Sequence, residues 1–153
     1  MYGVNMDCMT NTVMKEPLVD VVSRDMVMSN SCKVLQLDLC TMDPGDVEFS
    51  SEYVLRSNFN DKIHALVGFW DCEFSNLERP VMLSTSPFNK STHWKQTVLY
   101  LEHDLTVQKG DVLSGSIAVR KSLTNFRELD IKVSYHINTD TMKRDFVNLY
   151  KLR

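Results

Sequence analysis

The sequence predicts a mainly β protein, an antiparallel β-barrel or sandwich-like domain that follows a short N-terminal helix. Two observations carry this prediction. Before Pro17 the apolar residues recur at helical spacing, and after it they alternate with polar residues in short segments separated by turn formers. No second helical pattern of any length follows. A series of strands with short connections favours a sandwich or barrel over alternating β and α units.

The N-terminal helix is predicted from four apolar residues. Tyr2, Met6, Met9 and Val13 are spaced by four, three and four residues, which places them on one helical face. The helix should end before Pro17, because the residue preceding a proline is pushed out of the helical region. Taken alone, this pattern favours a helix that folds back on its own domain.

Seven later segments have the alternation typical of strands, although the first alternates cleanly only over its second half. Turns are predicted at Asp43-Pro44-Gly45-Asp46 and at Gln108-Lys109-Gly110-Asp111, because both contain the turn-forming residues Gly and Asp. In the segment 129–137 the odd-numbered residues are apolar and the even-numbered ones polar, so one side should be buried and the other wet. The seven predicted strands are 33–39, 47–56, 62–74, 94–101, 112–119, 129–137 and 145–152.

Length and composition exclude several classes of protein. A chain of 153 residues with 43% hydrophobic and 24% charged residues is expected to form one globular domain. A net charge of −3 with no basic stripe argues against nucleic-acid binding. Without a signal sequence or a membrane-spanning run, we expect a soluble intracellular protein. Its four cysteines lack the spacing of a metal site and are expected to be free thiols.

Motifs for cofactor binding and catalysis are missing from the sequence. The five glycines are scattered, so neither GxGxxG nor GxxxxGK[ST] occurs. Two carboxylate pairs occur, Glu102 with Asp104 and Glu128 with Asp130, and side chains at this spacing in a strand point the same way. We interpret both pairs as solvated surface charges rather than catalytic groups.

The loop 83–91 delivers Thr92, His93 and Trp94 to the start of a predicted strand. Loops held by rigid strands are favoured places for functional groups, and histidine changes charge near neutral pH. The alternative interpretation is structural: Trp94 caps the core, and His93 has no special role.

The segment THWKQTVLYLE, residues 92–102, closely resembles the THW loop and following strand of the protein arginine methyltransferases. Six other segments match that family in the same order, and the whole set is most similar to the type I branch. They are YGVNM at 2–6, KEPLVDVV at 15–22, HALV at 64–67 with Phe74, STSP at 84–87, and RELD at 127–130 with the final YKLR at 150–153.

The resemblance implies a two-part enzyme of which this chain is one part. In the family, a dinucleotide-fold domain binds S-adenosylmethionine and carries two catalytic glutamates, and a β-barrel with a dimerisation arm follows. Residues 1–16 are similar to the helical dimerisation arm and residues 17–153 to the β-barrel substrate-binding domain. We therefore expect no cofactor-binding or metal-binding residues in this chain, and no mono- or asymmetric dimethylation of arginine by it alone. Whether the chain acts as an enzyme is left open.

The resemblance also assigns roles to residues. Thr92, His93 and Trp94 match the loop that lines the substrate-arginine pocket, where the histidine supports catalysis by pairing with an acidic residue of the cofactor domain. In the family the arm docks on a second subunit, so Tyr2, Met6, Met9 and Val13 are expected to form a dimer contact rather than fold back.

Partners and location follow from the same resemblance. The expected substrates are arginine-containing proteins such as histones and RNA-binding proteins. The full-length protein is expected to form a homodimer through the arm in the nucleus and cytoplasm, without membrane or direct nucleic-acid contact. Two alternatives stay open: a non-catalytic short form that modulates a full-length methyltransferase, and an unrelated all-β interaction module.

Overall fold

The computed structural model describes residues 3, 5–138 and 143–153. Within them the chain is mainly β, as predicted, with antiparallel pairing throughout. The elements in chain order are η1 (Asp7–Met9), α1 (Thr10–Val13), β1 (Leu18–Asp20), η2 (Arg24–Met26), β2 (Phe49–Arg56), β3 (Asp61–Gly68), β4 (Asp71–Phe74), β5 (Val81–Ser84), β6 (Gln96–Val107), β7 (Val112–Lys121), β8 (Leu129–Asn138) and β9 (Lys143–Leu152).

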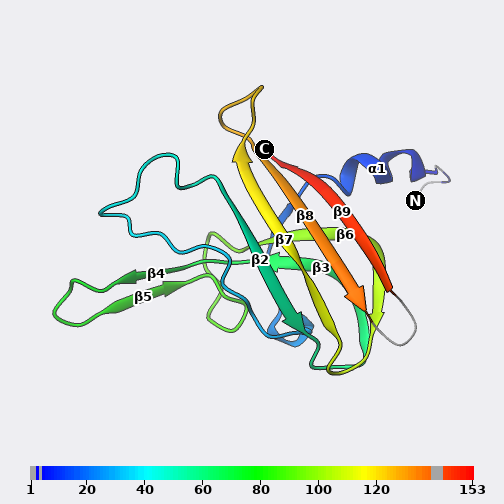
Figure 1. The fold of residues 1–153 in the computed structure, drawn as a ribbon, viewed down its shortest axis with the longest axis horizontal. Helices are drawn as coiled ribbons and strands as arrows, with labels where there is room; N and C mark the ends of the chain where they lie inside the picture. Colours follow the sequence, from blue (N-terminus) through cyan, green and yellow to red (C-terminus); the bar gives the residue numbers. More distant parts are fainter. Residues whose placement is uncertain (1–2, 4, 139–142) are drawn as a thin grey trace.

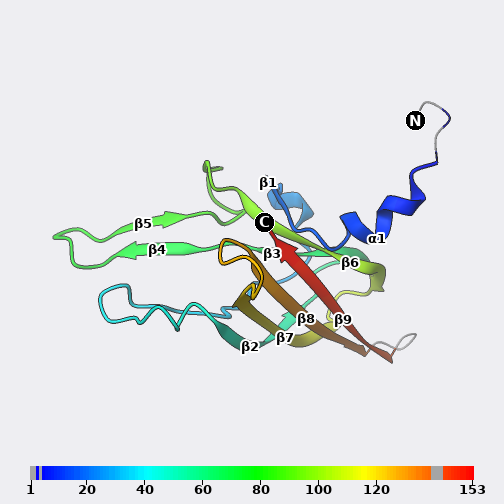
Figure 2. The same cartoon turned by 90° about the horizontal axis from the view of Figure 1, so that it is seen from above.

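The strands form two larger sheets and a separate hairpin. One sheet has the order β1-β6-β3, the other β2-β7-β8-β9, and β4 pairs only with β5. Figure 1 and Figure 2 show the two larger sheets as facing layers, with the β4–β5 hairpin projecting from one end. This is the sandwich-like arrangement that the sequence predicts.

The hydrophobic core lies between the two larger sheets. Leu105 on β6 and Val133 and Ile137 on β8 are fully buried, and their neighbours come from β2, β3, β7 and β9. Tyr150 on β9 also joins the sheets directly, because its hydroxyl donates a 2.7 Å hydrogen bond to the carbonyl oxygen of Tyr100 on β6. Apolar burial is the main force that holds the layers together.

The predicted alternation in 129–137 is confirmed. Ile131, Val133, Tyr135 and Ile137 are buried, whereas Lys132 on the opposite face is exposed. Both predicted turns are also present. In the first, Asp46 N–H donates to Asp43 O at 3.0 Å, and in the second Asp111 N–H donates to Gln108 O at 3.1 Å.

The strand predicted at 33–39 is wrong, because this segment joins no sheet. Val34 packs against the core and Leu37 is partly buried, whereas Leu35 and Leu39 are exposed. The two partly buried residues are three positions apart, so burial does not alternate as it does along a half-buried strand. The alternating residues lie in a connecting segment that pairs with no strand.

Several other strand boundaries differ from the prediction, and β6, predicted to end at residue 101, continues to Val107. The segment 62–74 divides into β3 and β4, which belong to different sheets, and the chain passes between them at Phe69 and Trp70. β6 begins at Gln96 rather than residue 94, because Thr92–Lys95 forms a turn. β1 and β5 were not predicted, since strands of three and four residues leave little periodic signal.

The N-terminal helix is shorter than predicted and begins only at Asp7. Tyr2 lies outside the described residues. The residues that follow this helix, Lys15 and Glu16, form its root and are fixed to the C-terminal end of the chain. Lys151 N–H on β9 donates to Lys15 O at 2.9 Å, and the Arg153 guanidinium lies 3.2 Å from the Glu16 carboxylate. Beyond the root, α1 extends away from the sheets (Figure 1, Figure 2). The division between residues 16 and 17 stays a prediction.

Candidate functional site

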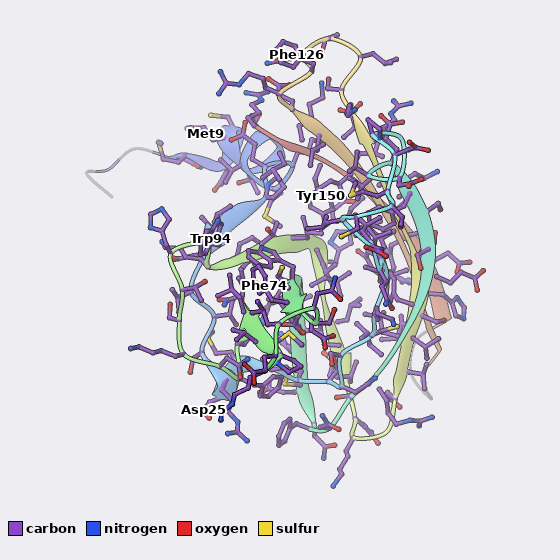
Figure 3. All side chains as sticks on the ribbon, turned by 90° about the vertical axis from the view of Figure 1, so that its left-hand side faces the viewer. Met9, Asp25, Phe74, Trp94, Phe126 and Tyr150 are labelled. Carbon is purple, nitrogen blue, oxygen red and sulfur yellow. The ribbon has the colours of Figure 1, made fainter. Side chains whose placement is uncertain are left out.

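The segment Thr92–Lys95 forms a tight turn that presents His93 and Trp94. Lys95 N–H donates to Thr92 O at 3.2 Å, which closes the turn around these two residues. Lys95 adopts φ = 55°, a left-handed conformation that redirects the chain into β6. Both central side chains are exposed, and Figure 3 shows Trp94 at the margin of the molecule, away from Tyr150 in the interior. The turn therefore displays the two residues that the sequence singles out.

A buried glutamine holds the base of this turn. Gln96 is 3% exposed, and both ends of its side-chain amide are used. Oε1 accepts a 2.8 Å hydrogen bond from Val22 N–H, and Nε2 donates a 2.7 Å bond to Thr85 O. One side chain thus joins the segment after β1, the segment after β5 and the first residue of β6.

Thr85 continues this network to Trp70. It is 1% exposed and forms three hydrogen bonds, each 2.9 Å long, with the backbone of Trp70. Two involve the Thr85 hydroxyl, which accepts from Trp70 N–H and donates to Trp70 O. The third runs from Thr85 N–H to Trp70 O. Trp70 is therefore fixed at the bend between β3 and β4.

The two tryptophans meet at the edge of the turn. The ring centroids of Trp70 and Trp94 are 5.7 Å apart, and the ring planes are inclined by 73°. This edge-to-face arrangement is favoured by the charge distribution of aromatic rings. The His93 ring lies 6.3 Å from that of Trp94, also edge to face. Trp94 is 56% exposed, so the ring offers its free face to a ligand.

An ion pair joins the turn to β1. The Lys95 ammonium lies 3.1 Å from Asp20 Oδ1, and the same oxygen accepts a 2.8 Å hydrogen bond from Val21 N–H. Two contacts lower the pKa of the Asp20 carboxyl below its usual value. The hydrogen bond from Val21 N–H has the largest single effect, and the Lys95 ammonium acts in the same direction. Both side chains are exposed, so the pair contributes little to stability and serves mainly to orient the turn.

Thr92 differs from its two neighbours. Its Oγ1 is buried and has no hydrogen-bond partner among the described residues. The structure therefore brings Thr92, His93 and Trp94 together at one turn but gives them different surroundings. Sequence reasoning did not single out Gln96, Thr85 or Trp70. The available signals were that Trp70 is the other tryptophan of the chain, that Thr85 lies within the STSP segment and that Gln96 lies within THWKQTVLYLE.

The predicted dimer-contact residues lie elsewhere, on the N-terminal helix. Met6, Met9 and Val13 are 56%, 48% and 56% exposed, so the described part of the chain does not cover them. The fold-back interpretation is therefore wrong. The physical reason is that the helix is anchored only at its root, by Lys15 and Glu16, and has no sheet beneath it.

Three of the four carboxylates in the two pairs have structural partners. Asp104 forms a 2.7 Å ion pair with Lys62, which lowers the pKa of Asp104. Asp130 lies 3.4 Å from Arg120, and Glu128 accepts a 3.0 Å hydrogen bond from Asn125 Nδ2. These contacts give Asp104, Asp130 and Glu128 structural roles that involve no catalysis.

The described residues contain no group of three His, Cys, Asp or Glu side chains that could hold a metal ion. A cofactor cradle of the helix-start type does not fit them either, because the helices there have at most four residues. Across this same part of the chain, no helix is long and apolar enough to cross a membrane.

Known proteins match this chain over nearly its whole length. The model of the arginine methyltransferase oligomerisation subdomain matches residues 1–141. Protein arginine N-methyltransferase 1 of Schizosaccharomyces pombe is 43% identical over 147 residues, which is 96% of this chain and 43% of that protein. Protein arginine N-methyltransferase 8-B of Danio rerio is 40% identical over 152 residues, which is 99% of this chain and 36% of that protein.

Solved structures agree with these matches. A chain of the Trypanosoma brucei PRMT1 enzyme–prozyme heterotetrameric complex with AdoHcy matches with a TM-score of 0.95 at 28% identity, over 100% of this chain and 49% of that one. Arabidopsis thaliana protein arginine methyltransferase 10 shares the fold, with a TM-score of 0.85 at 20% identity. The chain spans about two fifths of the length of the curated relatives described above.

Proposed function

The chain belongs to the protein arginine methyltransferase family, and on this premise we propose that it supplies the substrate-binding barrel and the dimerisation arm of such an enzyme. Residues 17–153 form the barrel part in this proposal and residues 1–16 the arm. The observation that carries it is the turn Thr92–Lys95, which displays His93 and Trp94 on a hydrogen-bonded base. The family reaction is the methylation of arginine in proteins, and the family depends on S-adenosylmethionine.

The turn suits one wall of a pocket for an arginine side chain. The free face of Trp94 can pack on the aliphatic stem of arginine and attract its guanidinium. The exposed His93 imidazole can hydrogen-bond to a carboxylate of the cofactor domain and so fix the position of the active-site groups. Methyl transfer needs in-line placement of the reacting atoms, and the bound cofactor supplies the electrophilic methyl group.

The surroundings of the turn suit a contact with a second domain. Leu18 and Val19 on β1, together with Trp70, Phe88 and Trp94, are large apolar residues that the described chain leaves exposed. β1 is joined to the turn through Asp20 and Lys95, so Leu18 and Val19 lie on a strand that is tied to the candidate site. Exposed apolar surface of this kind marks an interaction site. We assign it to the cofactor domain of the complete protein.

A chimera tests this proposal. The chain is joined to the cofactor domain of the Schizosaccharomyces pombe relative, and methylation of an arginine-rich peptide is measured. We expect activity in the chimera and a loss of roughly tenfold or more in His93→Ala. His64→Ala is the matched control, because His64 is also exposed and lies on β3. Equal activity of the two variants would remove His93 from the proposed mechanism.

Calorimetry of the 153-residue chain alone provides the second measurement. We expect no binding of S-adenosylmethionine by the chain alone and binding by the chimera. Binding by the isolated chain would overturn the proposal, because it would require a cofactor site within these residues. Histones and RNA-binding proteins are the proposed substrates, and the nucleus and cytoplasm the proposed location.

A second candidate function is a non-catalytic chain that modulates a complete methyltransferase. The matched Trypanosoma brucei assembly is described as an enzyme–prozyme heterotetramer, which favours this candidate. Addition of the 153-residue chain to the complete Schizosaccharomyces pombe relative separates the two functions. A change in the activity of that relative supports modulation, and unchanged activity argues against it.

A further inference from the structure

We infer that Gln96 is a positioning residue, which holds Trp94 at the candidate pocket through Thr85 and Trp70. The role of this network in arginine binding rests on the proposed function. The positioning itself rests only on the geometry of these four residues.

Within this network, Gln96 joins three chain segments: its own strand β6, the segment with Val22 and the segment with Thr85. Its amide bonds to Val22 N–H and Thr85 O are 2.8 Å and 2.7 Å long, and the side chain is buried. A buried amide that uses both its donor and its acceptor has one favoured position. Gln96 therefore fixes the distance between β6 and the segment that carries Thr85.

Thr85 transmits this position to Trp70 through three backbone hydrogen bonds. The Trp70 ring then meets the Trp94 ring at 5.7 Å. Trp94 is more than half exposed, so its own burial does not fix the ring. Its edge-to-face contact with Trp70 is what defines where the free face of Trp94 points.

Gln96 is also the residue that follows the turn Thr92–Lys95 in the sequence. Lys95, between Trp94 and Gln96, has a left-handed backbone that favours glycine. A residue in this conformation persists when the surrounding structure holds it there. The buried amide of Gln96 on one side and the Thr92–Lys95 hydrogen bond on the other provide that constraint.

The chain contains two tryptophans, Trp70 and Trp94, so their contact can be followed optically. Two indoles at this distance couple their transitions and give a circular-dichroism couplet. Trp70→Phe and Trp94→Phe should each abolish the couplet, which identifies its source. Gln96→Met, which keeps the volume but removes both hydrogen bonds, should reduce the couplet strongly.

A matched control separates positioning from general loss of stability. Val133→Ala also removes a buried group, but it lies on β8 in the other sheet. We expect this variant to lower the melting temperature and to keep the couplet. Gln96→Glu can still accept from Val22 N–H, but its carboxylate cannot donate to Thr85 O, so an intermediate couplet is expected. A full couplet in folded Gln96→Met would overturn the positioning role.

The functional consequence is measured in the chimera. Gln96→Met should raise the KM for an arginine-rich peptide by roughly tenfold or more, and leave the affinity for S-adenosylmethionine unchanged. Loss of the couplet with an unchanged peptide KM would overturn the link between Gln96 and substrate binding. An inactive unsubstituted chimera would instead overturn the proposed function, and the couplet measurement would still decide the positioning role.

Discussion

The indole rings of Trp70 and Trp94 lie edge to face with their centroids 5.7 Å apart, although 24 positions of sequence separate them. One ring belongs to the bend between two strands and the other to the turn before β6. Thr85 and Gln96 hold the two backbones in place. The candidate site is therefore built by hydrogen bonds that join connecting segments to the start of β6.

Thr85→Val should destabilise the chain by about 1–3 kcal/mol, measured by urea denaturation. The substitution keeps the shape of the side chain, but Trp70 N–H loses the hydroxyl that accepts its hydrogen bond. Thr106→Val on β6 is the matched control, because Thr106 is exposed. A cost for Thr85→Val no greater than that of the control would contradict the role of the hydroxyl.

Gly115→Ala should cost more than about 3 kcal/mol or prevent folding. A Cβ on Gly115 would overlap the backbone of Ser134 on the adjacent strand. Tyr53 lies opposite Gly115, and its hydroxyl donates to Ser134 O at 3.0 Å, so the phenol crosses the glycine. Gly68→Ala on β3 is the control. A Cβ there would lie 3.7 Å from Thr97 O, so the cost should stay within about 1 kcal/mol.

Stability should fall in alkaline solution, because burial raises the pKa of Tyr53, Tyr135 and Tyr150, that of Tyr135 to about 12. A raised folded-state pKa gives stability that is complete below the unfolded value of about 10 and is lost as the pH rises toward the folded value. Urea denaturation at a series of pH values measures this slope.

Tyr135→Phe provides the control for the alkaline effect. Its hydroxyl has no hydrogen-bond partner among the described residues, so the substitution removes a titrating group without breaking a bond. The variant should lose less stability between about pH 10 and 12 than the unsubstituted chain. Parallel curves for the two proteins would rule out Tyr135 as a source of the effect.

Combined substitution of Met6, Met9 and Val13 by serine should weaken self-association of the chimera but leave its fold intact. These side chains are about half exposed, so each change should alter stability by less than about 0.5 kcal/mol. Sedimentation velocity measures the dimer. Val147→Ser with Leu149→Ser is the control, since both are exposed on β9. Equal association of the two variants would contradict the arm contact.

The local sequence pattern was enough to predict the four strands of the β2-β7-β8-β9 sheet. In 129–137 the alternation gave the correct buried face, because one side of β8 meets the core and the other meets water. The turn at 108–111 was also predictable, because its hydrogen bonds join residues three positions apart. Gln108 N–H donates to the Asp111 carboxylate, and Asp111 N–H donates to Gln108 O. Such features depend on neighbours in sequence.

Features that depend on distant partners were not predictable. The segment 33–39 alternates in its second half but has no neighbouring strand, and 62–74 looks like one strand although its two halves join different sheets. Pairing is decided by which edges become available when the sheets pack. Gln96 was overlooked for the same reason, because its partners Val22 and Thr85 are 74 and 11 residues away.

The sequence by itself determined the fold class, the buried face of β8 and the residues that carry the family resemblance, His93 and Trp94 among them. These follow from the period of apolar residues and from short motifs. Only the tertiary structure decided that Trp94 rests against Trp70, that Gln96 joins three segments, and that the helix with Met9 stands away from the sheets. The physical reason is that hydrogen bonds and ring contacts between distant segments form only after burial of the core has brought those segments together.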